Sequence, residues 1–327
     1  MNESIRRRGA LQWLAAAGLA THVPAMAQPA NWPSKALRLI VPYPAGGSPD
    51  STSRSVSEQV SRILGTSVVI ENRPGGSGLI GVRAMTAQPA DNHTLVYLSS
   101  GHVTLAAMPA PFDLLREVRL VTRLTNSPYA LVVNAESSYQ TVGDLIKAIQ
   151  ARPGALTFGT AGQGSPAHMA VEYMTEAVPG LNATHIPFKG AVESANAILG
   201  KQIDFTIGVL GALLPNIQGG KLRALAVTTP ARLPSLPNVP TMAESGVPGY
   251  QYAAWGGLAM HKDTPDAIVQ RMHQALVEAC ATEAVRTHVA RNAGVMDLTE
   301  SPRAFVAAVE KEIVNERRVV KRLGLTG

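Results

Sequence analysis

The chain reads LIVPYPAGGSPD at residues 39–50 and LTFGTAGQGSP at residues 156–166. In both segments an apolar run leads into a glycine-rich turn that ends in Gly-Ser-Pro. Serine is a preferred N-cap and proline a preferred first helical residue, so each segment predicts a helix start capped by Ser48 or Ser165. Unpaired backbone N–H groups at a helix start bind anions, helped by the positive end of the helix dipole. The repetition suggests two halves that hold one small anion between them.

Apolar runs of strand length alternate with helical patterns along most of the chain. The expected strands are 37–42, 67–71, 94–98, 129–133, 156–159, 184–188, 203–208 and 224–228. This βαβ alternation predicts an α/β fold with largely parallel sheets. Open α/β sheets bind ligands at the carboxyl ends of their strands, so the loops that follow these strands form the candidate site.

A proline-rich segment at residues 229–250 interrupts the alternation, and helical patterns follow at 265–281, 282–292 and 302–323. A helical tail of this kind commonly packs back on an earlier domain. We therefore expect a discontinuous first domain at residues 28–126 plus 253–327. The inserted second domain is expected at residues 127–252.

Residues 1–27 have the pattern of a secretory signal peptide: Arg6-Arg7-Arg8 precedes an apolar run, and Ala25-Met26-Ala27 marks the cleavage site. The paired arginines followed by Gly9-Ala10-Leu11 loosely resemble a twin-arginine signal, but the lysine and strong aromatic residue of that signal are missing, so Sec and twin-arginine export both stay open. Cleavage would lower the formal charge from +6 to +4. No later stretch approaches 18 consecutive apolar residues, so we expect a soluble periplasmic protein.

Composition and motifs argue against several function classes. Basic residues are scattered, apart from a cluster at Arg317, Arg318, Lys321 and Arg322, and aromatic residues make up 5% of the chain, which disfavours nucleic-acid binding. Cys280 is the single cysteine, and the histidines lack metal-ligand spacing, so no disulfide, metal or cofactor is expected. The segment GSGLIG at 76–81 fits G-x-G-x-x-G, but Asp91 precedes the next strand, which favours a glycine turn opening a helix over a dinucleotide site. Catalytic signatures are missing, so an enzyme is not expected.

The candidate ligand-binding residues lie at or near the ends of the expected strands. They are Tyr43, Ala45, Gly46, Gly47, Ser48, Asp50, Ser99, Thr160, Ala161, Gly164, Ser165, His168, Lys189, Gly190 and Asp204. Hydroxyl groups among them can add donors for a carboxylate. Asp50 is expected to cap its helix and to meet a ligand only through water or a ligand donor group. Lys189 can offer an ammonium group to an anion. For His168 we favour hydrogen bonding at the start of its helix, and for Asp204 we favour a role in holding a turn.

Seven segments in order resemble one family, the extracytoplasmic solute receptors of tripartite tricarboxylate transporters. They are WPSK at 32–35, residues 39–50, VIENRPGGSG at 69–78, residues 158–168, IPFKG at 186–190, LPNVPTMAESGVPGY at 236–250 and WGGL at 255–258. The resemblance implies a type II periplasmic-binding-protein fold, with two α/β domains joined by crossing strands around a ligand cleft. It also implies that residues 43–50 and 159–165 hold the ligand carboxylate, largely through backbone and ordered water. Asn92-His93 departs from the family's usual Gly-Tyr and could alter the cleft.

These patterns and the resemblance lead to one functional expectation: a periplasmic receptor that captures a small carboxylate and acts as a monomer. The ligand would be a dicarboxylate, an amino acid or an aromatic acid, delivered to the membrane permease subunits of a tripartite transporter. One alternative is a sensor component that presents the ligand to a sensor kinase ectodomain of a two-component system. Another is a secreted α/β hydrolase, which would need a nucleophile–base pair that the sequence does not display.

Overall fold

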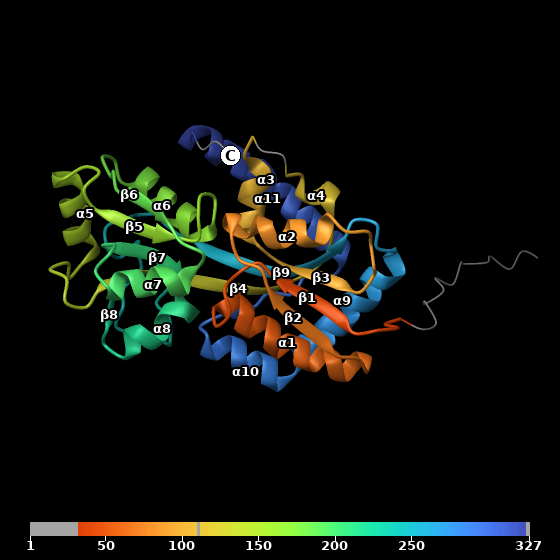
Figure 1. Ribbon diagram of the computed structural model, residues 1–327. Coiled ribbons are helices and arrows are strands. Elements are labelled where there is room, and N and C mark those ends of the chain that lie inside the picture. The colour runs from red at the N-terminus through yellow and green to blue at the C-terminus, as the bar shows by residue number, and fades with distance from the viewer. Residues whose placement is uncertain (1–31, 110–111, 325–327) are drawn as a thin grey trace, which may run out of the picture.

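A computed structural model describes residues 32–109 and 112–324, which form two lobes side by side (Figure 1). The expected signal peptide at 1–27 lies outside the described residues. Within the described ranges, the helices are too short or too polar to span a bilayer.

The first lobe is built on strands β2-β1-β3-β9-β4, in that order. These strands are β1 (Leu37–Val41), β2 (Val68–Asn72), β3 (Thr94–Ser99), β9 (Ala253–His261) and the first part of β4 (Val118–Asn134), with the short β10 (Val295–Met296) beside β4. Its helical elements are α1 (Ser48–Leu64), η1 (Gly76–Gly78), α2 (Leu79–Thr86), α3 (Ser100–Ala107), α4 (Leu114–Glu117), α9 (Asp266–Ala281), α10 (Glu283–Arg291) and α11 (Pro302–Leu323). The GSGLIG segment thus forms a glycine turn that opens α2, as favoured from the sequence.

The second lobe continues the sheet from β4 through β7, β5 and β6, and β8 also pairs with β4. These strands are β5 (Thr157–Thr160), β6 (Thr184–Pro187), β7 (Phe205–Val209) and β8 (Leu222–Val227). The helices are α5 (Val142–Ala151), α6 (Pro166–Ala177), α7 (Ala191–Leu199) and α8 (Leu210–Gln218). Each expected strand of this lobe appears within two residues of its predicted bounds.

The long strand β4 connects the two lobes. Its residues from Val118 to Pro128 pair with β9, and from Tyr129 onward it pairs with β7 and β8. The sequence predicted only 129–133 of β4 and did not predict β9. Both strands run antiparallel to all their partners, so the expectation of largely parallel sheets was wrong and the sheet is mixed. The partner change lies close to the expected boundary at 126/127, and the domain bounds stay a prediction.

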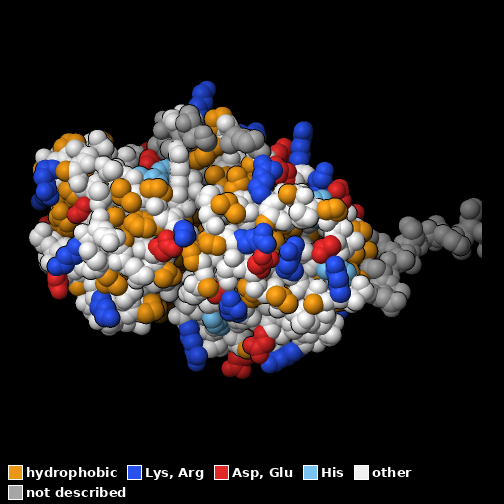
Figure 2. All heavy atoms as spheres, in the orientation of Figure 1, with side chains coloured by type: hydrophobic (Ala, Val, Ile, Leu, Met, Phe, Trp, Pro, Cys, Tyr) orange, Lys and Arg blue, Asp and Glu red, His pale blue; other side chains and the backbone are white. Residues whose placement is uncertain are grey.

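The carboxyl-terminal helices pack on the first lobe, α9 against α1 and α11 against α3. Apolar residues such as Val56 of α1 and Met272 of α9 are buried in one core cluster. On the face drawn in Figure 2, Lys and Arg side chains are interspersed with Asp and Glu and form no continuous basic patch.

Candidate functional site

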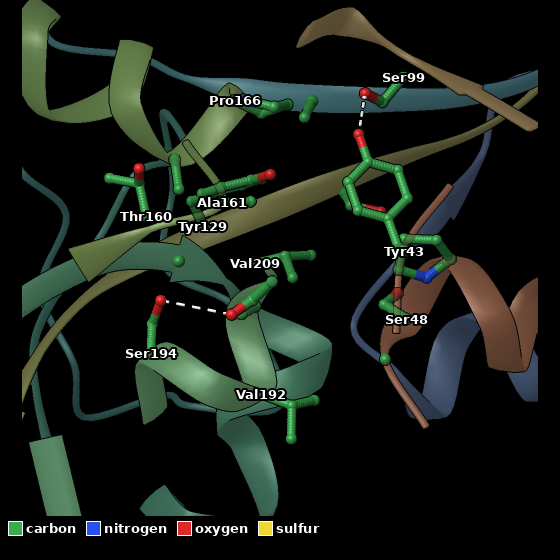
Figure 3. Close-up of a pocket in the computed structure, with 18 of the residues that line it drawn as sticks. Tyr43, Ser48, Ser99, Tyr129, Thr160, Ala161, Pro166, Val192, Ser194 and Val209 are labelled. Carbon is green, nitrogen blue, oxygen red and sulfur yellow. Dashed lines mark hydrogen bonds between the residues drawn. The ribbon is translucent and has the colours of Figure 1, made fainter. Parts of the chain in front are cut away.

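A cavity with a volume of about 80 Å³ lies between the lobes. Side chains and backbone from both lobes line it, and Figure 3 shows most of them. The lining residues are Tyr43, Pro44, Gly47, Ser48, Pro49, Tyr97, Ser99, Ser127, Tyr129, Thr160, Ala161, Pro166, Ala167, Gly190, Ala191, Val192, Ser194, Thr206, Gly208, Val209, Ala254 and Trp255. The volume is far below the several hundred Å³ of sites for drug-sized ligands, so the cavity suits a small molecule.

The amino-terminal ends of α1, α3, α6, α7 and α8 lie at this cavity. Each contributes its cap or first residues to the lining: Gly47 for α1, Ser99 for α3, Pro166 for α6, Gly190 for α7 and Val209 for α8. Their dipoles and free N–H groups favour an anion. The lining residues include no charged side chain. An anion here would therefore be held by backbone and hydroxyl groups and not by an ion pair.

The first Gly-Ser-Pro loop differs from its prediction at the cap. Gly47, with φ −76° and ψ 167°, is the N-cap of α1, and Ser48 is the first helical residue. The expectation that Ser48 caps this helix was wrong, because the Asp50 carboxylate folds back and accepts a hydrogen bond from the Gly46 N–H at 3.0 Å. The Ser48 hydroxyl is left at the cavity wall (Figure 3).

Asp50 stabilises this loop and does not line the cavity. Its buried carboxylate also accepts hydrogen bonds from the Arg54 guanidinium at 3.0 Å and from the Asn72 amide at 2.9 Å. Burial by itself raises the pKa of Asp50, but the bonds from Arg54, Gly46 and Asn72 and the Arg54 charge lower it below the ordinary value. Asp50 therefore holds the loop before α1, and its carboxylate lies in the first turn of that helix, but it accepts no hydrogen bond from a backbone N–H group of the helix itself.

The lowered pKa of Asp50 gives a prediction for acid stability. The stability that ionised Asp50 contributes is complete above the pKa of about 4 that its carboxyl has in the unfolded chain. This stability is lost as the pH falls through the lower pKa of Asp50 in the folded protein. We expect Asp50→Asn to cost about 2 kcal/mol at pH 7, because it replaces charge-assisted hydrogen bonds with neutral ones. Urea unfolding measured from pH 7 to pH 3 should show that the variant loses less free energy of unfolding on acidification than the wild-type protein. An equal loss in both proteins would contradict the stabilising role of Asp50.

The second loop has the predicted cap. The Ser165 hydroxyl accepts a hydrogen bond from the His168 N–H at 3.3 Å, and Pro166 begins α6. Thr160 and Ala161 line the cavity, whereas Gly164 and Ser165 do not. The Thr160 hydroxyl accepts from the Gly162 N–H at 3.0 Å and lies 2.6 Å from His185 Nε2, so it holds the loop as well as lining the cavity.

Most of the remaining predicted residues do not line the cavity. Ala45 and Gly46 are exposed on the first loop. The buried His168 ring accepts from the Gly164 N–H at 3.3 Å through Nδ1; burial, and then His185, lower the pKa of His168 to about 4. Gly190 lines the cavity, but the exposed Lys189 does not. The structure therefore brings together Tyr43, Gly47, Ser48, Ser99, Thr160, Ala161 and Gly190.

The candidate Asp204 and the departure at Asn92-His93 lie away from the lining. Asp204 accepts hydrogen bonds from the N–H and hydroxyl of Thr157, at 2.7 and 3.1 Å, and holds a turn, as favoured from the sequence. Asn92 has φ +58° in the turn before β3, while Ser99 at the other end of β3 lines the cavity. The departure at Asn92-His93 therefore does not touch the cavity lining.

Sequence reasoning missed the cavity floor, which we define as Tyr97, Ser127, Tyr129, Ala254 and Trp255. These residues come from β3, β4 and β9. Their convergence depends on pairing between distant strands, for which the local pattern holds no signal. Val209 was also missed. It lies at the carboxyl end of β7, and the other loops were predicted because open α/β sheets bind ligands at the carboxyl ends of their strands.

Hydrogen bonds also join the two lobes directly. The Ser77 hydroxyl of η1 donates to the Gln163 carbonyl at 2.7 Å, and the Tyr173 hydroxyl of α6 donates to Glu316 of α11 at 2.8 Å. The glycine turn that resembled a nucleotide motif thus supplies a contact between the lobes. Among the residues described, no group of three or more His, Cys, Asp or Glu side chains could hold a metal.

Comparison with known proteins gives concordant matches. The family model for the tripartite tricarboxylate transporter family receptor (TctC) matches residues 52–325. Protein BugT of Bordetella pertussis is 32% identical over 318 residues, which cover 95% of each chain.

Solved structures match over the same extent. Periplasmic binding protein BugD has a TM-score of 0.84 at 25% identity and covers 90% of this chain and 99% of its own. A Rhodopseudomonas palustris protein with adipate has a TM-score of 0.84 at 29% identity, with the same coverage. MatC of that organism, with bound malate, has a TM-score of 0.83 at 25% identity and covers 88% of this chain and 100% of its own. These matches confirm the expected α/β periplasmic-binding-protein fold.

Proposed function

Since this chain belongs to the tripartite tricarboxylate transporter receptor family, we propose that it captures a small carboxylate in the periplasm and delivers it to a membrane permease of that transporter type. Family membership supports a solute-binding receptor and not an enzyme. We thus propose three things together: that the ligand is a small carboxylate, that the chain is exported, and that a permease is its partner.

The observation that carries the proposal is the set of helix amino termini around a cavity that no charged side chain lines. A carboxylate placed there can accept hydrogen bonds from backbone N–H groups and hydroxyls of both lobes. Binding to both lobes at once favours the closed arrangement, which a permease can distinguish from an open one. Relatives solved with malate and with adipate support the carboxylate class.

The hydrolase alternative finds no support in the cavity. None of its lining residues is a histidine, cysteine, aspartate or glutamate, so the serine and threonine hydroxyls there have no general base beside them on the lining. Two of these hydroxyls contact a histidine that does not line the cavity: Thr160 lies 2.6 Å from His185 Nε2, and Ser99 lies 3.4 Å from His102 Nδ1. Among the described residues, no carboxylate is hydrogen-bonded to either histidine, so neither pair forms a catalytic triad.

A thermal-shift experiment tests the proposal. Purified protein without residues 1–27 should melt at a higher temperature with at least one of malate, succinate, adipate, glutamate or benzoate. At a hundred times the dissociation constant the ligand adds about 2.7 kcal/mol, which raises Tm by several degrees. The amide of the same acid, in which each carboxylate is replaced by an uncharged carboxamide, serves as the matched control and should give no shift. If none of the acids raises Tm, the receptor proposal is wrong.

A further inference from the structure

Two phenol groups on the cavity floor have no hydrogen-bond partner among the described residues. They belong to Tyr97 of β3 and Tyr129 of β4, the strands on either side of β9. Each residue is 6% exposed, and neither hydroxyl oxygen is among the fully enclosed, unpartnered side-chain atoms of the described residues. Both oxygens therefore keep access to the cavity, where a ligand or water can reach them.

The neighbouring Tyr43 differs, since its hydroxyl is 2.7 Å from the Ser99 hydroxyl (Figure 3). That pair is already satisfied within the protein. Tyr43 and Tyr97 pack edge to face, with ring centroids 6.2 Å apart, and Tyr129 lies beside Ala161, across the cavity from Tyr43 (Figure 3). The two unpartnered phenols are therefore placed by packing, and their hydroxyls have no structural duty within the described protein.

A glycine in β9 makes room for one of them. A Cβ atom on Gly256 would overlap the Tyr97 hydroxyl oxygen, and it would come within 2.6 Å of Tyr97 Cζ. Only glycine at this position allows the Tyr97 ring to lie over β9. Burial raises the pKa of both phenols above the ordinary value near 10, so both remain protonated hydrogen-bond donors at physiological pH.

We propose that Tyr97 and Tyr129 are specificity-determining residues that donate hydrogen bonds to a second oxygen function of the ligand. This inference rests on the proposed function, in which the helix termini hold the first carboxylate. The ligand class is a short carboxylic acid that carries another oxygen acceptor, such as a second carboxylate, a keto group or a hydroxyl group. An acid with a purely apolar body would leave two buried donors unpaired, which a site of this kind rejects.

Paired probes that differ in one end group test the inference. We would measure dissociation constants for succinate against butyrate, and for adipate against hexanoate, by titration calorimetry. The wild-type protein should bind one diacid at least tenfold more tightly than its monoacid. Tyr97→Phe and Tyr129→Phe should each reduce this preference at least threefold, because the diacid loses a hydrogen bond and the monoacid no longer leaves that donor unpaired.

Two further variants complete the design. Tyr139→Phe removes a phenol hydroxyl from a half-buried residue that does not line the cavity, so its preference should equal that of wild type. Gly256→Ala should weaken the preference like Tyr97→Phe, because its methyl group displaces the Tyr97 ring. A preference for the diacid that survives in both Tyr→Phe variants overturns the inference while the receptor function stands. Loss of all binding by the wild-type protein would reject the proposed function itself.

Discussion

Replacing Gly190 by valine is expected to weaken carboxylate binding at least about 100-fold, or about 2.8 kcal/mol. Gly190 lies on the second lobe at the start of α7, and a Cβ atom there would come 2.9 Å from Pro44 Cδ on the first lobe. Backbone strain plays no part, because φ is 178° and any residue adopts this extended conformation. The valine side chain would hold the lobes apart and leave the ligand in contact with water on one side.

Gly143→Val is the matched control for this prediction. Gly143 lies in α5 of the same lobe, and a Cβ atom there meets only Thr141 Oγ1, at an ordinary 3.7 Å. Calorimetric titration should show wild-type affinity for the control and lost or greatly reduced affinity for Gly190→Val, with both variants folded by circular dichroism. Wild-type affinity in Gly190→Val would show that closure at Pro44 is not needed to hold the ligand.

The sequence predicted those parts of the fold that depend on local pattern. The three carboxyl-terminal helices appear within one residue of their expected bounds, because each has a regular apolar face and a clear start signal. The Ser165-Pro166 helix start was also correct, since nothing competes for the Ser165 hydroxyl. At Ser48 the same motif failed as a cap, because Asp50 two residues later takes over the bonding of the loop.

Long-range pairing explains what was missed. Strand β9 contains Gly256 and Gly257, and glycine weakens the local signal for a strand. Both glycines are needed for contacts with distant residues: Gly256 accommodates Tyr97, and a Cβ atom on Gly257 would lie 2.9 Å from Phe305 Cζ. These long-range contacts assemble the cavity floor. The local sequence pattern therefore identified the loops that line the site, but not the residues of the floor.

Phe305→Ala is expected to lower the free energy of unfolding by about 4 kcal/mol and to weaken carboxylate binding as well. The Phe305 side chain of α11 is fully buried and packs edge to face against Trp255 of the cavity floor, with ring centroids 5.2 Å apart. The indole N–H also donates to Glu312 of α11 at 2.6 Å. Loss of the phenyl ring would leave a void behind Trp255 and let the floor shift.

Val314→Ala provides the control on the same helix, because Val314 is 66% exposed and should change stability by less than about 0.5 kcal/mol. Urea unfolding measures the stability of both variants, and calorimetric titration measures their affinity for the same acid. If Phe305→Ala is destabilised but binds with wild-type affinity, α11 contributes to stability alone. If affinity falls as well, the helix at the carboxyl-terminal end of the described chain fixes the floor on which the ligand rests. The binding site would then depend on packing from a segment that does not touch the ligand.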